Sequence, residues 1–200
     1  MSSSAVKHAG NDEAAARLSL EKKACLDEIM KKAELFVESE EVQKKRLAVV
    51  AGNQVITVAG VLVNETTGPL TVVEIYIYQG NIITDFPHTI PAGDEGYFAM
   101  TGIDVVEAVV VYCGKNEAGV ECAWGLYFYV DTNGNTEVSV WCSPIGNFLD
   151  MNKDEIKKIM KRDGKNSYCT DVGAQSAYMA AYIYNTSPGN YAVGAYYYAS

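Results

Sequence analysis

Seven of the fourteen tyrosines of this chain lie within its last 23 residues, and these side chains are well suited to contacting a ligand. A phenol combines a flat apolar ring with a polar hydroxyl, so a row of tyrosines can stack on a sugar, surround a choline-like cation or lie among membrane headgroups. Tyr182, Tyr184, Tyr196 and Tyr198 are the main candidates. The alternative is that they are ordinary tyrosines of a barrel or sandwich, with their hydroxyls in water. The pattern indicates a recognition surface without identifying its ligand.

No catalytic or metal-binding motif accompanies the tyrosines. The chain has no phosphate-cradling Gly-rich loop before a helix, no GxSxG and no HExxH. His88 lies in a turn-rich stretch without metal-ligand spacing. Asp131, Asn133 and Asn135 resemble half of a calcium loop, but the glycine and the distal glutamate are misplaced, so we interpret them as a turn. We therefore predict a non-enzymatic protein without a cofactor or metal ion.

The distribution of charge restricts the partners. The net charge is −9, and residues 48–150 contain twelve acidic side chains against one basic side chain, Lys115. Such an acidic body disfavours binding to nucleic acid, and it also disfavours strong attachment to anionic lipid by charge alone. A zwitterionic lipid headgroup and a neutral glycan both remain compatible.

The cysteines and the hydropathy indicate a reducing compartment. Five cysteines without a CxxC motif predict free, mostly buried thiols, although Cys113 and Cys122 flank one hairpin loop and could pair on oxidation. No apolar run is long enough for a transmembrane helix, and no hydrophobic segment of a signal peptide stands at the start. We therefore expect a cytoplasmic protein.

The N-terminal quarter of the chain is predicted to be helical. Residues 1–11 read as a flexible tail, and residues 12–50 as a helical segment. An apolar stripe runs along this segment and includes Cys25, Ile29 and Ala33. Such a helix can dock on a sheet, join a partner helix in a homo-oligomer or lie in a membrane interface. We favour docking or an oligomer contact, because most amphipathic helices of soluble proteins serve packing.

Residues 51–200 are predicted to form one β-domain, in which apolar residues recur with a period of two. The expected strands end in local turns, which is typical of an antiparallel sandwich or barrel. They cover residues 54–64, 70–78, 96–101, 105–113, 122–131 and 136–142, followed by a terminal tyrosine hairpin with the phenols of its first strand on one face.

One helix, at about residues 152–163, interrupts these strands. Asn152 and Glu155 predict a capping box at its start. Ile156, Ile159 and Met160 are expected to face inward. Its lysines are expected to face solvent, with contact to an anionic ligand as the alternative.

Several strand motifs, spread over about residues 15–145, resemble the small jasmonate-induced proteins of plants. The preceding charged helices fit the same pattern. The motifs are Gly60-Val-Leu-Val-Asn64, Ala108-Val-Val-Val-Tyr-Cys113, Cys122-Ala-Trp124 and Tyr127-Phe-Tyr-Val130.

That family is in turn similar to a wider set of Nakanori-like and actinoporin-like β-sandwiches. The resemblance implies a non-enzymatic sandwich that recognises a membrane lipid headgroup or a glycan in a stress or defence setting. It also raises two alternatives: a scaffold protein that oligomerises through its N-terminal helix, and a pore-forming protein whose helix inserts into membranes.

The chain departs from the actinoporin headgroup pocket. Actinoporins place a serine and a proline where this chain has Tyr129 and Asp131, so these two residues join the candidate ligand-binding residues. Actinoporins also place tyrosines on the late helix, where this chain has Ile156, Met160 and Lys161. The resemblance therefore implies the fold more directly than it implies the ligand.

Overall fold

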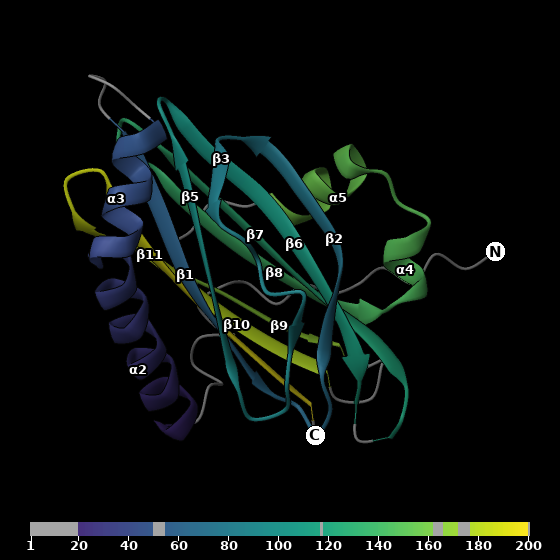
Figure 1. Cartoon of the computed structure of the whole chain (residues 1–200). Helices are drawn as coiled ribbons and strands as arrows, with labels where there is room; N and C mark the ends of the chain where they lie inside the picture. Colours follow the sequence, from purple (N-terminus) through teal and green to yellow (C-terminus); the bar gives the residue numbers. More distant parts are fainter. Residues whose placement is uncertain (1–19, 50–54, 117, 162–165, 172–176, 200) are drawn as a thin grey trace.

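The chain forms two β-sheets packed face to face, with helices on both outer faces (Figure 1). The computed structural model describes residues 20–49, 55–116, 118–161, 166–171 and 177–199. The predicted mainly-β sandwich with an N-terminal helical segment and one late helix is confirmed. The predicted tail lies outside the described residues.

The helical elements are α2 (Leu20–Val37), α3 (Glu40–Val49), α4 (Gly146–Leu149) and α5 (Lys153–Met160). The strands are β1 (Ile56–Glu65), β2 (Leu70–Gln79), β3 (Asn81–Thr84), β4 (Thr89–Ile90), β5 (Glu95–Gly102), β6 (Val105–Lys115), β7 (Glu121–Asp131), β8 (Thr136–Pro144), β9 (Asn166–Asp171), β10 (Ala177–Ser187) and β11 (Asn190–Ala199).

One sheet has six strands in the order β3-β5-β1-β11-β10-β9, and the other has five in the order β4-β2-β6-β7-β8. All described pairs are antiparallel except β1 and β11, which run parallel, with Thr57 opposite Asn190 and Glu65 opposite Tyr198. The terminal hairpin therefore places β11 inside the six-stranded sheet, between β1 and β10. Parallel neighbours need a long connection, and here that connection is most of the domain.

The main core lies between the sheets, and its large side chains include Phe98, Trp124, Phe128 and Tyr197. Most residues of β1, β6 and β7 are buried. The second sheet covers one face of these strands and a helix covers the other. Because both faces are buried, their sequences are nearly continuous apolar runs.

Helix α2 docks on the outer face of the six-stranded sheet, which is one of the two packing roles that its apolar stripe predicted. Leu26, Ile29, Met30 and Ala33 are buried against β1, β10 and β11. Gly194 permits this close approach, because a Cβ at that position would lie 2.5 Å from the Met30 Sδ. The stripe therefore packs within its own chain.

Polar contacts tie the junction of α2 and α3 to the turn between β10 and β11. The Glu38 carboxylate accepts hydrogen bonds from Thr186 Oγ1 at 3.1 Å, Ser187 Oγ at 2.7 Å and Asn190 Nδ2 at 3.2 Å. Arg46 donates to Asn190 Oδ1 at 2.9 Å. These contacts fix where α2 ends and α3 begins above the sheet.

The Glu38 contacts make part of the stability depend on pH. Hydrogen bonds from Ser187, Asn190 and Thr186, with the nearby Arg46, lower the pKa of Glu38 from its ordinary 4.5. A carboxyl with a lowered folded pKa adds stability above its unfolded pKa, and this stability is lost as the pH falls below it. We expect Glu38→Gln to lower the free energy of unfolding at neutral pH by at most about 1 kcal/mol, because the site is exposed.

Urea denaturation across a pH series would measure this effect. The difference between wild type and Glu38→Gln should shrink as the pH falls below 4.5, the ordinary pKa of the carboxyl. Glu40→Gln is the matched control, since its carboxylate contacts Lys44 of the same helix at 3.0 Å. A difference that stayed constant down to acid pH would contradict the assignment.

Helices α4 and α5 cover the outer face of the five-stranded sheet (Figure 1). The predicted capping box of α5 is confirmed, because Asn152 Oδ1 accepts from the backbone of Glu155 at 3.1 Å and Glu155 Oε2 accepts from the backbone of Asn152 at 3.0 Å. Ile156 and Met160 are buried as predicted. Ile159 was expected to face inward but is 38% exposed. Ile156 and Met160 form the side of this short helix that packs on the sheet, and Ile159 lies outside that contact.

The cysteines differ from the predicted set of free thiols. Cys142 is disulfide-bonded, which is the form that cysteines keep in oxidising compartments. Cys25 and Cys113 are free thiols. Cys113 and Cys122 do not pair, since Cys122 lies in the core between the sheets while Cys113 faces outward from the neighbouring strand.

Candidate functional site

Most tyrosines of the terminal hairpin share the outer face of the six-stranded sheet, under α2, but Tyr191 and Tyr197 belong to the core between the sheets. Tyr182, Tyr184 and Tyr196 pack against the apolar residues of that helix. In β10, Met179, Ala181 and their neighbours on the same side belong to the core between the sheets. The predicted division between phenols and aliphatic residues in this strand is therefore present, and a helix covers the phenols.

Tyr184 is bonded directly to α2. Its hydroxyl donates to Glu34 Oε2 at 3.1 Å and to the Met30 carbonyl at 3.4 Å. Burial, with a smaller effect of Glu34, raises the pKa of Tyr184 to about 12. Burial likewise raises the pKa of Tyr196 to about 12, so both phenols stay protonated.

Tyr198 lies beyond these contacts and is 6% exposed. Its ring stacks on Tyr178, with centroids 4.7 Å apart and an interplanar angle of 7°. The centroid of the Tyr198 ring also lies 5.2 Å from the centroid of the Tyr196 ring. The four hairpin candidates thus share one face and pack there against α2 or against each other. Ligand binding by them stays a prediction.

Tyr129 and Asp131 lie on the other sheet, in β7. The Tyr129 hydroxyl donates to Asp131 Oδ2 at 3.2 Å. Asp131 Oδ1 accepts from the backbone of Asn133 at 2.9 Å and of Asn135 at 3.0 Å. Burial acts to raise the pKa of Asp131, but hydrogen bonds from Asn135, Tyr129 and Asn133 outweigh it and leave the pKa below its usual value.

Asp131 thus organises the turn between β7 and β8, as the turn interpretation predicted. Both of its carboxylate oxygens accept hydrogen bonds from the turn or from Tyr129, and the bond from the Tyr129 hydroxyl holds that side chain in place. Within the part of the chain that the structure describes, no group of three or more His, Cys, Asp or Glu could hold a metal ion. The role of Asp131 seen here is to position its neighbours.

A hollow of about 440 Å³ opens beside Tyr129, and we call it the Tyr129 hollow. It forms where the turn between β2 and β3 meets the turn between β5 and β6. The residues that give it its chemistry are Gln79, Asn81, Ile103, Asp104, Glu107 and Tyr129.

The groups around the Tyr129 hollow can bind a polar ligand. Asn81 and Asp104 are exposed and offer an amide and a carboxylate, while the Tyr129 ring offers an apolar surface. Ile103, on the rim, is 49% exposed. The described lining of the hollow contains no serine, threonine or cysteine. Hydrogen bonding to a polar ligand is therefore what this arrangement can do.

Glu107 is the buried charge of the site, with 4% of its surface exposed. Its carboxylate accepts from Lys157 Nζ at 2.7 Å and from the Tyr127 hydroxyl at 2.9 Å. Burial, then Glu107 and Glu137, raises the pKa of Tyr127 far above its usual value, so this phenol is a permanent donor. This network fixes the inner wall of the hollow.

Lysines of the late helix lie over the aromatic rings of this region. Lys157 Nζ is 4.5 Å from the centroid of Tyr78, and Lys161 Nζ is 5.4 Å from that of Tyr129. An ammonium over a ring face is a cation–π contact. The chain's own lysines therefore already make cation–π contacts with these rings, so the ammonium of a ligand would have to pair with the exposed carboxylate of Asp104 and not with an aromatic ring.

Sequence reasoning singled out Tyr129 but missed Ile103, Asp104 and Glu107. Glu107 is the one charged residue between Val105 and Cys113 in an otherwise apolar strand, and that isolation was the available signal. Ile103 and Asp104 occupy a tight turn, where a lone apolar residue carries no pattern of its own.

No protein-family model matches the chain, and no curated protein matches it either. Among solved structures it is similar to the lipid binding protein Nakanori, with a TM-score of 0.58 over 83% of this chain and 84% of that chain, at 15% sequence identity. It also matches the wild-type lectin XCL of Xerocomus chrysenteron, with a TM-score of 0.41 over 71% of this chain and 99% of that chain, at 10% identity. At this identity the first likeness shows the fold: the chain is a Nakanori-like β-sandwich.

Proposed function

We propose that this chain is a non-catalytic recognition protein that binds the headgroup of a membrane lipid in the Tyr129 hollow. The observation that carries the proposal is the composition of the hollow. Amide, carboxylate and phenol groups converge on it, and Ile103 stands exposed on its rim. Convergent polar groups fix the orientation of a small polar ligand, while an exposed apolar residue can enter the lipid interface.

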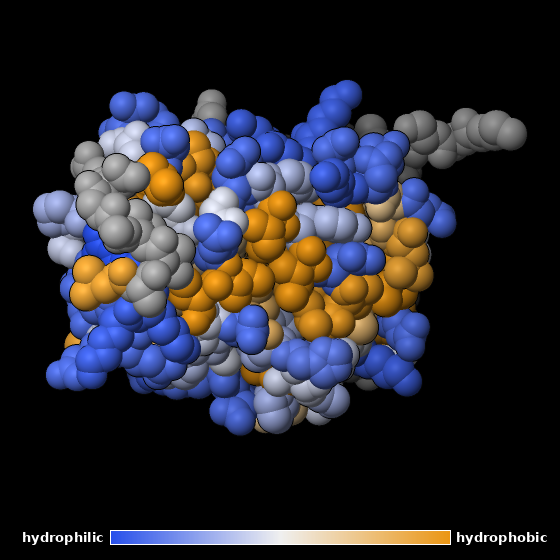
Figure 2. Space-filling view, turned by 45° about the horizontal axis from the view of Figure 1, so that its top comes forward, coloured by the Kyte–Doolittle hydropathy of each residue, from blue (hydrophilic) through white to orange (hydrophobic). Residues whose placement is uncertain are grey.

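The apolar surroundings favour a lipid over a free glycan. Ile77, two residues before Gln79 of the hollow, is 37% exposed. On the face that it views, Figure 2 shows apolar side chains gathered in a band that hydrophilic side chains border. No helix in the described residues is long and apolar enough to cross a bilayer. Contact through a rim of apolar side chains needs no such helix.

The charge of the body favours a zwitterionic headgroup. Asp104 is exposed at the hollow, and residues 48–150 contain twelve acids and one base. Anionic lipid would be repelled, whereas a headgroup carrying both charges would not. The fold is shared with a protein described as lipid-binding, which supports this choice of ligand class.

Vesicle flotation with the full chain would test the proposal. We expect binding to vesicles of phosphatidylcholine and weaker binding when phosphatidylserine is added. Ile103→Asp and Tyr129→Ala should each weaken the binding constant for the vesicles about tenfold, which corresponds to the loss of about 1.4 kcal/mol. Leu149→Asp, at a residue that is 63% exposed on the far side of α4, is the matched control and should bind as wild type does.

Two outcomes would overturn this assignment. Equal loss of binding in Ile103→Asp and Leu149→Asp would mean that the hollow is not the site. Binding to immobilised neutral glycans without binding to any vesicle would replace the lipid with a glycan. Flotation of a variant with Tyr182, Tyr184, Tyr196 and Tyr198 changed to phenylalanine would show whether the hairpin hydroxyls contribute.

Exposed leucines support the second function that the sequence raised, self-association through the N-terminal helices. Leu35 and Leu47 are each 74% exposed on α2 and α3. Light scattering of the wild type and of Leu35→Asp/Leu47→Asp would test it, since a monomeric wild type excludes this role. The third function, pore formation, requires α2 to leave the sheet and predicts dye leakage from vesicles.

We also propose a biological role and a cellular location for the protein. A role in stress or defence rests only on the resemblance of the strand motifs to those of plant jasmonate-induced proteins. A cytoplasmic location also belongs to the proposal, although the disulfide-bonded Cys142 favours an oxidising compartment. Immunolocalisation of the native protein, with a thiol count under non-reducing conditions, would decide between the two.

A further inference from the structure

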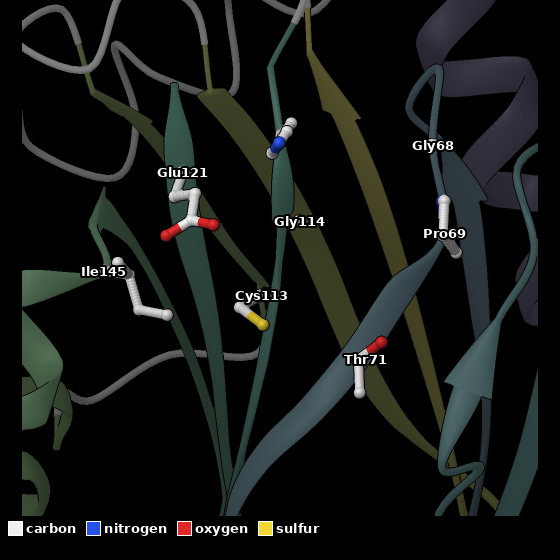
Figure 3. Close-up of a pocket in the computed structure, with 8 residues that line it drawn as sticks. Gly68, Pro69, Thr71, Cys113, Gly114, Glu121 and Ile145 are labelled. Atoms are coloured by element: carbon white, nitrogen blue, oxygen red, sulfur yellow. The ribbon is translucent and has the colours of Figure 1, made fainter. Parts of the chain in front are cut away.

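A second cleft, of about 380 Å³, lies at the opposite end of the five-stranded sheet. We call it the Cys113 cleft. Its lining includes Pro69, Thr71, Cys113, Lys115, Glu121 and Ile145. In Figure 3 the side chains of Thr71, Cys113, Glu121 and Ile145 lie around one opening, and they come from β2, β6, β7 and the residue before α4.

The Cys113 cleft is separate from the Tyr129 hollow. Strand β6 runs from Val105, which lines the hollow, to Lys115, which lines the cleft. At about 3.3 Å per residue, these ten steps separate the two places by roughly 33 Å. A ligand of the cleft would therefore be a second ligand, independent of the proposed lipid headgroup.

The interior of the cleft is apolar. Thr71 and Cys113 are cross-strand partners on its floor, and Ile145 forms one wall. Burial, and then the nearby Glu121, raises the pKa of the Cys113 thiol. Because the thiol stays neutral at physiological pH, the floor presents an uncharged sulfur beside the methyl and hydroxyl groups of Thr71.

The mouth of the cleft carries one charge of each sign. Lys115, the single base of residues 48–150, lies directly across from Glu121 in the register of β6 and β7. Both side chains are exposed, and neither has an ion-pair partner among the described residues. Side chains directly opposite each other across an antiparallel pair have Cβ atoms about 5 Å apart. An ammonium and a carboxylate are thus available side by side above an apolar interior.

We propose that the Cys113 cleft binds a small zwitterion with an apolar body, of which a free hydrophobic α-amino acid is the simplest case. Its carboxylate would pair with Lys115, its ammonium with Glu121, and its side chain would lie over Thr71, Cys113 and Ile145. A ligand that carries only one charge leaves one of the two exposed residues unpaired. A ligand with both charges satisfies each of them, which makes the zwitterion the complementary class.

Protection of Cys113 from alkylation tests this proposal with the full-length protein. Cys25 is the internal control, because it is also free and partly buried, with a pKa that burial raises, and it lies on α2. We expect L-phenylalanine at millimolar concentration to slow iodoacetamide labelling of Cys113 at least threefold and to leave Cys25 unchanged. Peptide mass spectrometry reads both sites in one sample.

Single-charge analogues and single variants locate each contact. Phenylpropanoate lacks the ammonium and phenethylamine lacks the carboxylate, so both should protect Cys113 less than phenylalanine does. In the Lys115→Met variant, phenylalanine should protect Cys113 only as well as phenethylamine protects it in the wild type. In the Glu121→Gln variant, phenylalanine should protect Cys113 only as well as phenylpropanoate protects it in the wild type. Both residues are exposed, so we expect both variants to fold as wild type does.

Three results would overturn the proposal: no protection by any of the probes, equal protection of Cys25 and Cys113, or equal protection by the three probes. None of these bears on the vesicle experiment, because Ile103 and Tyr129 lie at the other end of the sheet. The failure of either proposal can therefore be recognised without affecting the other.

Discussion

Replacing Lys157 with methionine is expected to lower the free energy of unfolding by about 3 kcal/mol. The reason is the carboxylate of Glu107, which is 4% exposed and lies 2.7 Å from the Lys157 ammonium. A buried ion pair adds little net stability, because desolvation of both charges offsets their attraction. Removing one partner is costly, because the remaining charge is then buried without a counterion.

The remaining partner of Glu107 cannot replace the lysine. Tyr127 donates one hydrogen bond at 2.9 Å, but it carries no positive charge. Lys157 also covers the ring of Tyr78, so Lys157→Met preserves part of the apolar packing and mainly removes the charge. The expected loss is therefore electrostatic in origin.

Thermal and urea unfolding of three variants would check this result. Lys158→Met is the matched control, since Lys158 is the exposed neighbour on the same helix. The double variant Lys157→Met/Glu107→Met should recover most of the stability, because it removes both charges and fills the site with apolar groups of similar size. Equal effects of Lys157→Met and Lys158→Met would contradict the role of the buried pair.

Features governed by local pattern could be predicted from the sequence. The period of two located the long strands, and Asn152 with Glu155 located the start of α5. The apolar stripe on α2 predicted either docking or an oligomer contact, and Ile29 and Ala33 of this stripe dock on the sheet. Each of these signals lies within a few residues of the feature that it predicts.

Features that join distant segments could not be predicted in the same way. The parallel pairing of β1 with β11 joins Thr57 to Asn190, and no local signal records that partnership. The same holds for the cover that α2 provides over Tyr184. A row of phenols has the same period whether water, a ligand or a helix lies over it.

The Tyr129 hollow shows the same limit. Asn81, Ile103, Glu107 and Tyr129 come from four segments that meet only at the end of the sandwich. Their residue types are ordinary for turns and strands, so the combination becomes informative only after folding. The charge distribution, in contrast, could be read in advance, and it marks Lys115 as an unusual residue before its place at the Cys113 cleft is known.

Replacing Gly60 with alanine is expected to destabilise the fold by about 3 kcal/mol, the upper end of the usual cost of overpacking. Gly60 lies opposite Phe98 in the pair formed by β1 and β5. A Cβ at residue 60 would stand 2.1 Å from the Phe98 Cε1, far inside van der Waals contact. The ring of Phe98 lies across the glycine, which is why the strand carries no side chain there.

Phe98 cannot move aside easily, and this makes the expected effect of Gly60→Ala large. Its ring stacks on Phe86 at 4.4 Å between centroids and contacts Phe128 at 5.4 Å, so it belongs to an aromatic cluster that spans the two sheets. Displacing it would also disturb the facing sheet. The substitution therefore acts on the whole core and not on one strand.

Urea denaturation of a double-mutant cycle would establish the cause. Phe98→Leu alone should destabilise the protein, yet in the Gly60→Ala background it should restore part of the lost stability by clearing space for the methyl group. Gly68→Ala is the control, because a Cβ there meets nothing within 4 Å, and its effect should stay within about 0.5 kcal/mol. Strictly additive effects of the two core substitutions would show that the contact between residues 60 and 98 is not what excludes a side chain from this strand.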